Sequence, residues 1–248
     1  MQEYFIILAP LLIFYYKIIM TTIIQAFFAN LKVEIINNKK DFFFKIIFTS
    51  FILSFAIWWQ NTLSMFTDIS ALNIPVGDIL FVIIPKYDLS LIYFLGMWIL
   101  FPLGIGYAIY KIPEKIPFVI FSFALFFFIR GICISSTYIG IPPDHITPYL
   151  NIPSFFNLHL NIFSLVQFFR NDLFFSGHTG IPFLISLFFW DFKIFRNIFI
   201  IISIVMAVTV ISMRIHYSID IIGAYFITYG IFKTSVVAYA KIEKILKV

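Results

Sequence analysis

Charged residues are scarce in this chain of 248 residues. Only 12% are Asp, Glu, Lys or Arg, whereas roughly a quarter of a soluble globular protein is charged. Hydrophobic residues make up 62% of the chain and aromatic residues 21%. This balance excludes a water-soluble globule and indicates an integral membrane protein.

Cysteine is also scarce, and the residue types that bind metals do not cluster in the sequence. Cys133 is the single cysteine, which excludes an internal disulfide. His145 and His159 have no partner at a recognisable spacing, and no His, Cys or carboxylate pattern of metal-ligand spacing occurs. The net charge of +5 comes from scattered residues that form no basic patch. We therefore predict no metal, no cofactor and no nucleic-acid partner.

Long apolar stretches dominate what is present. A helix needs about 20 apolar residues to cross a bilayer. The sequence predicts an all-α polytopic bundle of six spans, at 42–59, 90–110, 117–139, 175–191, 196–213 and 217–238. An additional N-terminal apolar helix over 4–29 is interrupted by Lys17, and we predict that it lies in the interface or crosses at a tilt. The chain thus divides into a segment 1–41 and one membrane domain, 42–248.

Basic residues are unevenly distributed among the loops. Most lie in alternate loops and at the ends of the six-span core: Lys32, Lys39, Lys40, Lys45, Lys111, Lys115, Lys193, Arg196, Lys233, Lys241, Lys244 and Lys247. The other loops, 60–89, 140–174 and 212–216, hold fewer basic residues and five aspartates. The positive-inside rule places both ends of the core in the cytoplasm. The other loops then face the periplasm, the cell exterior or a lumen.

The stretch HYSID, at 216–220, begins the last predicted span. His216 and Asp220 are four residues apart, so a helix places them on one face. A carboxylate can hold the proton on one imidazole nitrogen and leave the other nitrogen as nucleophile or base. A polar pair that ties a helix end is the structural alternative. Ionisable residues in or beside a span are costly, which favours the catalytic interpretation.

The stretch SGHT, at 176–179, begins the fourth predicted span at the same outer face. Ser176 is a plausible N-cap, and Gly177 allows a ligand to approach the backbone closely. A helix N-terminus suits an anion such as phosphate. His178, on the first turn, can act as a general acid or base. Two histidines at one depth predict two-step phosphoryl transfer.

Nearby charged residues are candidates for substrate binding. Arg214 lies two residues before His216, and Arg130 lies inside the third predicted span. Either guanidinium could bind phosphate oxygens. Asp172 either orients a group of the site or caps a turn. Arg170 is more simply explained as a solvated loop charge.

Three stretches resemble the sphingomyelin synthase-like branch of the type 2 phosphatidic acid phosphatase superfamily. They are RGICISSTYIGIPP at 130–143, NDLFFSGHTGIPFL at 171–184 and RIHYSIDIIGAYF at 214–226. The second also resembles inositol phosphorylceramide synthases of plants and protists. The resemblance implies a six-helix membrane fold in which His216 is the nucleophile, Asp220 supports it and His178 serves the leaving group and the acceptor. The family's third-span arginine and the aspartate before SGHT fall on Arg130 and Asp172.

Two departures separate the chain from ordinary lipid phosphatases of that superfamily. The motif of Lys, six residues and Arg-Pro is absent, and Val210 stands where those enzymes carry an arginine six residues before the nucleophilic histidine. Fewer basic residues favour a phosphodiester over a phosphomonoester dianion.

The residues and the resemblance together predict a membrane phosphotransferase. It would move a phospho-head group from a glycerophospholipid to a lipid alcohol such as ceramide. The same site with water as acceptor would be a phospholipase C-like hydrolase or a lipid phosphatase. A noncatalytic lipid-binding membrane protein is the alternative from another class, and the intact triad argues against it. The oligomeric state stays open.

Overall fold

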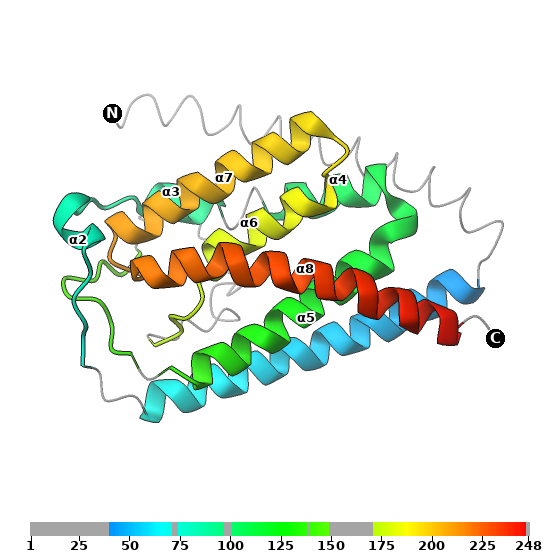
Figure 1. Ribbon diagram of the computed structural model, residues 1–248, viewed down its shortest axis with the longest axis horizontal. Helices are drawn as coiled ribbons and strands as arrows, with labels where there is room; N and C mark the ends of the chain where they lie inside the picture. The colour runs from blue at the N-terminus through cyan, green and yellow to red at the C-terminus, as the bar shows by residue number, and fades with distance from the viewer. Residues whose placement is uncertain (1–39, 71–73, 97–100, 138, 149–170, 247–248) are drawn as a thin grey trace, which may run out of the picture.

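A computed structural model describes residues 40–70, 74–96, 101–137, 139–148 and 171–246 (Figure 1). The predicted N-terminal helix over 4–29 lies outside these residues. Helices account for the regular structure, and the described residues contain no strand. The elements are the helix Lys40–Ser70, α2 (Leu80–Ile83), α3 (Ser90–Leu95), α4 (Phe101–Lys111), the 3-10 turn η2 (Pro113–Lys115), α5 (Ile116–Ser135), α6 (Gly177–Phe188), α7 (Lys193–Ser212) and α8 (Ser218–Leu246).

Four helices are long and apolar enough to cross a bilayer: Lys40–Ser70, η2 continued by α5, α7 and α8. They indicate an integral membrane protein of all-α class. The predicted span 90–110 is divided between α3 and α4, with 97–100 outside the described residues. The predicted span 175–191 corresponds to α6, whose 12 residues are shorter than a bilayer requires. The count of six spans therefore stays a prediction.

The first predicted span, 42–59, is too short. The helix Lys40–Ser70 has 31 residues, about 46 Å at 1.5 Å per residue, against a hydrocarbon core of about 30 Å. Polar residues from Gln60 to Thr62 lower the hydropathy, but 60–70 contains neither proline nor glycine, so nothing breaks the helix. Its last turns extend into the loop predicted over 60–89.

The helices run back and forth along one long axis (Figure 1). The helix Lys40–Ser70, α5 and α7 all end at the left end of the view, where α6 and α8 begin. Residues from the three motif-bearing stretches, at 130–143, 171–184 and 214–226, therefore meet at one end of the bundle. The opposite end holds the loop before α5, the α6–α7 turn and the C-terminal half of α8.

The short helix α6 lies at the centre and packs against α7 and α8. Ten of its 12 residues are buried. The core around it is aromatic and aliphatic; Phe126 of α5 meets Phe175 edge to face at 5.3 Å between ring centroids. Ser203 of α7 donates a hydrogen bond to the Thr179 carbonyl at 2.7 Å, which ties α7 to the first turn of α6. The packed core and this hydrogen bond thus hold in place the helix that carries SGHT.

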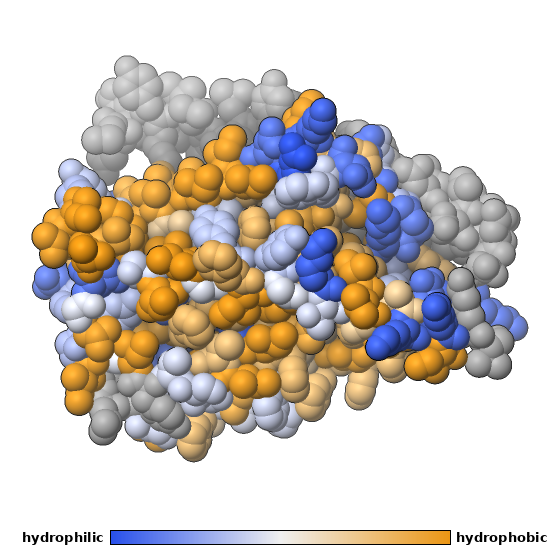
Figure 2. Space-filling view, viewed as in Figure 1, coloured by the Kyte–Doolittle hydropathy of each residue, from blue (hydrophilic) through white to orange (hydrophobic). Residues whose placement is uncertain are grey.

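Large apolar side chains cover much of the outer surface (Figure 2). On α7 and α8 they include Ile201, Val205 and Phe226, the last being 77% exposed. Hydrophilic residues gather instead near the α6–α7 turn and the C-terminal half of α8 (Figure 2). An apolar outer surface is what contact with lipid tails requires, since they offer polar groups no hydrogen bonds.

Gly180 is required where α6 meets α8. A Cβ there would lie 2.8 Å from Thr228 Oγ1 and 3.0 Å from the Phe126 ring. We expect Gly180→Ala to destabilise the fold by about 1–3 kcal/mol, because the neighbours must shift in a packed core. Gly230→Ala is the matched control, since nothing lies within 4 Å of a Cβ on that glycine. Thermal unfolding in detergent measures both, and equal midpoints would contradict the packing account.

Candidate active site

The imidazole of His216, two residues before α8, lies beside the carboxylate of Asp220 in the first turn of that helix. His216 Nδ1 is 3.3 Å from Asp220 Oδ2, and the side chains are 2% and 0% exposed. The same oxygen accepts a hydrogen bond from the Tyr217 N–H at 2.9 Å. A carboxylate at a helix N-terminus is stabilised as an anion. With Nδ1–H donated to Asp220, His216 presents an unprotonated Nε2.

The N-terminus of α6 is joined directly to this turn. Ser176 caps the helix, its hydroxyl accepting a hydrogen bond from the Thr179 N–H at 3.4 Å. The Ser176 N–H in turn donates to the Asp220 carbonyl at 3.1 Å. SGHT and HYSID, 40 positions apart at their first residues, thus share one backbone connection.

His178 projects from the first turn of α6 toward His216. The ring centroids are 6.1 Å apart with 56° between the planes. Nδ1 of His178 is buried and has no hydrogen-bond partner among the residues that the structure describes. Its ring instead contacts Tyr93 of α3, at 4.4 Å between centroids. A reacting atom placed between the two imidazoles would be within reach of both.

Arg130 and Asp172 form a buried ion pair beside the same helix end. Arg130 Nη2 is 2.8 Å from Asp172 Oδ1, and Nη1 donates to Oδ2 at 3.1 Å. Nε donates to the Phe175 carbonyl at 2.9 Å. A Cβ on Gly177 would lie 3.3 Å from Nε. The glycine therefore admits the guanidinium, and the bidentate pair fixes one positive charge next to the α6 N-terminus.

The guanidinium of Arg214 is directed to α2 and not to the paired imidazoles of His178 and His216. Its backbone has φ 57°, and its guanidinium donates to the carbonyls of Phe81 and Ile84 at 2.8 and 2.9 Å. It also lies 4.4 Å from the centroid of the Phe81 ring. These contacts hold α2 against the end of α7. They do not place the guanidinium at the paired imidazoles, so a role in phosphate binding has no support from the described contacts.

Two residues that the sequence did not single out hold the HYSID turn. Asp78, from the loop before α2, accepts hydrogen bonds from the Ser218 N–H and, at 2.8 Å, from the Leu80 N–H. Tyr217 donates its hydroxyl to the Gly140 carbonyl at 2.9 Å and is stacked on Phe81. An aspartate before an apolar run predicts a helix cap, so the bond from Leu80 to Asp78 could be predicted from sequence. The bond from Ser218 to Asp78 joins residues 140 positions apart, and nothing in the local sequence predicts it.

His145 has a structural contact. Its Nδ1 lies 3.0 Å from the Arg214 carbonyl, and the neighbouring Ile146 N–H donates to the Met213 carbonyl at 2.9 Å. The loop thus clamps the turn that precedes His216. His159 and Arg170 lie outside the described residues.

Asp88 caps the helix that carries Tyr93. It accepts hydrogen bonds from the Ser90 hydroxyl at 2.6 Å and from the Ser90 N–H at 3.0 Å. These bonds favour the carboxylate and lower the pKa of Asp88.

Across the described part of the chain, no three His, Cys, Asp or Glu side chains gather as metal ligands would.

Comparison with known proteins adds one finding. No curated protein and no solved structure matches the chain. Residues 171–237 match the family model described as PAP2 superfamily C-terminal, the superfamily of type 2 phosphatidic acid phosphatases. The matched stretch begins at NDLFFSGH and contains His178, His216 and Asp220. The match covers about a quarter of the chain and shows that this stretch is similar to the C-terminal part of the PAP2 superfamily.

Proposed function

We propose that the chain is a membrane lipid phosphotransferase. It transfers a phospho-head group from a glycerophospholipid to a lipid alcohol such as ceramide, through a phosphohistidine intermediate. One observation carries the proposal: His216, paired with Asp220 at 3.3 Å, faces His178 at 6.1 Å between ring centroids. That arrangement supplies a nucleophile and a separate proton carrier on opposite sides of a phosphorus atom.

In the first step, Nε2 of His216 attacks phosphorus and an N–P bond forms. The bond from phosphorus to the diacylglycerol oxygen breaks, and the imidazolium of His178 gives that oxygen its proton. Asp220 stabilises the positive charge that develops on His216, because its carboxylate accepts a hydrogen bond from Nδ1–H. The N–H groups at the α6 N-terminus and the guanidinium of Arg130 stabilise the oxygens on phosphorus.

In the second step, the hydroxyl of the acceptor lipid attacks phosphorus and the N–P bond breaks. His178, now neutral, takes the hydroxyl proton, and His216 regains its lone pair. The enzyme returns to its starting protonation state, so no further reactant is needed.

Charge at the site favours a phosphodiester. Val210, at the position six before His216, is buried and supplies no charge. Asp172 offsets much of the positive charge that Arg130 places beside the α6 N-terminus, and Arg214 is turned to α2. A phosphodiester monoanion needs less positive charge than a phosphomonoester dianion. Head-group transfer fits this site better than removal of a terminal phosphate.

An assay with head-group-labelled phospholipid in detergent, with and without ceramide, tests the proposal. We expect label in a new lipid that forms only when the lipid alcohol is present. Label found only in the water-soluble phospho-head group would make the enzyme a phospholipase C-like hydrolase. Release of inorganic phosphate from phosphatidic acid, with the labelled phospholipid left intact, would make it a phosphatase. No turnover with any donor would leave a noncatalytic lipid-binding protein.

Tyr93 is expected to position His178. Its ring is 4% exposed and lies against the imidazole, whose Nδ1 has no hydrogen-bond partner in the described part of the chain. We expect Tyr93→Ala to lower kcat about 10²-fold, since a misplaced general acid costs roughly that much. Tyr93→Phe keeps the ring and should retain most of the activity. Equal losses in both variants would instead assign the effect to the hydroxyl.

A further inference from the structure

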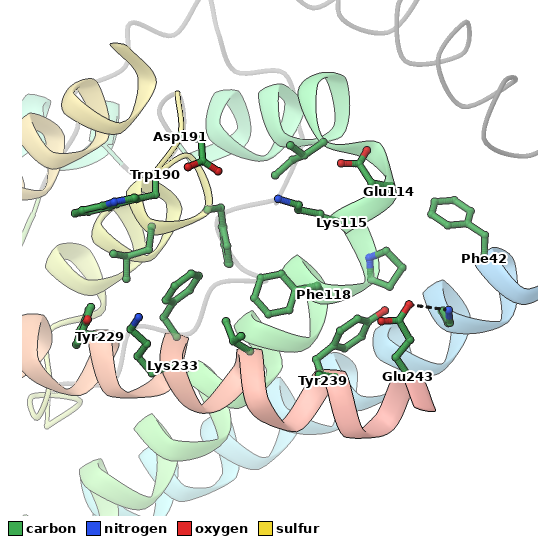
Figure 3. Close-up of a pocket in the computed structure, with 18 of the residues that line it drawn as sticks. Phe42, Glu114, Lys115, Phe118, Trp190, Asp191, Tyr229, Lys233, Tyr239 and Glu243 are labelled. Atoms are coloured by element: carbon green, nitrogen blue, oxygen red, sulfur yellow. Dashed lines mark hydrogen bonds and ion pairs between the residues drawn. The ribbon is translucent and has the colours of Figure 1, made fainter. Parts of the chain in front are cut away.

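A second site lies at the end of the bundle opposite to the paired histidines. It is a pocket of about 940 Å³ between the start of α5, the end of α6 and the C-terminal half of α8 (Figure 3). Its volume is in the range of pockets that hold a small-molecule ligand. On α8, 13 residues separate Asp220 from Lys233, which is about 20 Å of helix. The pocket is therefore distinct from the candidate active site.

The inner wall of the pocket is aromatic. Three phenylalanines from three helices pack together there: Phe118 of α5, Phe188 of α6 and Phe232 of α8. The ring centroid of Phe118 lies 5.9 Å from that of Phe188 and 6.2 Å from that of Phe232, and the last two are 6.0 Å apart. Ile112 and Leu187 add aliphatic surface. Such a wall suits the upper part of an acyl chain, since it removes apolar surface from water.

Charged side chains line the rim. Lys115 and Lys233 extend over the pocket from α5's side and from α8, while Glu114 and Asp191 lie on the loops above (Figure 3). Among the described residues none of these four takes part in an ion pair. Lys45, which also lines the pocket, is paired with Asp41 and Glu243 of the same wall. Two cations and two carboxylates thus surround one apolar hollow without an ion pair to any described residue, and the Lys233 ammonium lies over the Tyr229 ring, 5.4 Å from its centroid.

We infer that this pocket binds a zwitterionic phospholipid of the leaflet opposite to the active site. The two lysines match the phosphate and the two carboxylates match the ammonium group, as charge complementarity requires. An anionic phospholipid would leave Glu114 and Asp191 beside like charge. Trp190 and Tyr239, also on the pocket wall, are side chains that favour the level of lipid head groups.

The inference does not depend on the proposed reaction, so its test uses the His216→Ala chain, in which turnover is removed. Phosphatidylethanolamine and phosphatidylglycerol, each with a photoreactive group high in one acyl chain, are crosslinked to the purified protein in mixed micelles. Peptides are then mapped by mass spectrometry. We expect phosphatidylethanolamine to label the wall residues 229–243 about tenfold more than phosphatidylglycerol does, since each charge-assisted contact contributes about that factor.

Variants identify the contacts. Lys115→Gln/Lys233→Gln and Glu114→Gln/Asp191→Asn should each lower this labelling about tenfold. Lys241→Gln/Lys244→Gln, which removes the same charge from exposed sites outside the pocket, should leave it unchanged. Labelling within 171–184 serves as an internal reference for folded protein. Equal labelling by the two lipids, or full labelling in the Lys115/Lys233 variant, would overturn the inference.

Discussion

Replacing His216 by alanine or glutamine abolishes head-group release, with an expected loss of about 10³-fold or more. Neither side chain can form the N–P bond. Because His216 is 2% exposed, the alanine variant leaves a small void, and the glutamine variant retains most of the volume. Radiolabelled phospholipid turnover in detergent measures both, and thermal unfolding shows that the folds persist.

Asp220→Asn provides the graded control for that result. The amide keeps the shape, but it no longer carries the charge that stabilises protonated His216. The turnover rate of Asp220→Asn should lie between the rates of the wild-type enzyme and of His216→Gln. Wild-type turnover in His216→Gln would exclude this histidine as the nucleophile.

Arg130→Met is expected to lower both stability and activity. Removal of one partner from a buried ion pair costs about 3–5 kcal/mol, because the other charge is left uncompensated. Asp172 is 22% exposed, against 7% for Arg130, so the lower end of that range applies. The midpoint of thermal unfolding in detergent measures the change.

The double variant Arg130→Met/Asp172→Leu separates the two effects. It removes the orphaned carboxylate, so we expect part of the stability to return. Activity should stay low, since the fixed positive charge beside the α6 N-terminus is still missing. Recovery of activity together with stability would show that Arg130 serves the fold alone.

Local spacing was sufficient to predict the contacts within each motif. The four-residue step from His216 to Asp220 predicts one helix face. The structure has the pair 3.3 Å apart, but His216 lies two residues before α8, so the pair does not share a helix face. Ser176 before an apolar run predicts a cap, and its hydroxyl accepts from the Thr179 N–H. Both contacts join a residue just before a helix to the first turn of that helix, where a short sequence separation keeps the partners close.

Contacts between distant segments could not be predicted in the same way. Arg214 is adjacent to HYSID in sequence, yet its positive φ and the carbonyls of Phe81 and Ile84 direct its guanidinium to α2. Asp78 reaches Ser218 across 140 residues. The orientation of a long side chain depends on which loop packs beside it, and a single sequence carries no record of that.

The extents of the helices were also only partly predictable. Hydropathy falls at Gln60, which predicts that the first span ends at residue 59. The helix nevertheless continues to Ser70. Hydropathy reports where lipid ends, whereas helix termination requires a proline, a glycine or a cap. Conversely, α6 is shorter than its apolar stretch because the chain turns after Phe188.

The central claim is that His216 carries the phospho-head group during turnover. The most direct measurement is mass spectrometry of protein that has been incubated with phosphatidylcholine and phosphatidylethanolamine without acceptor and then quenched in alkaline denaturant. The account predicts a head-group phosphate adduct on the peptide that contains His216, absent from His216→Gln and discharged when ceramide is added before the quench. Continued turnover with no adduct, or an adduct on His178, would contradict it.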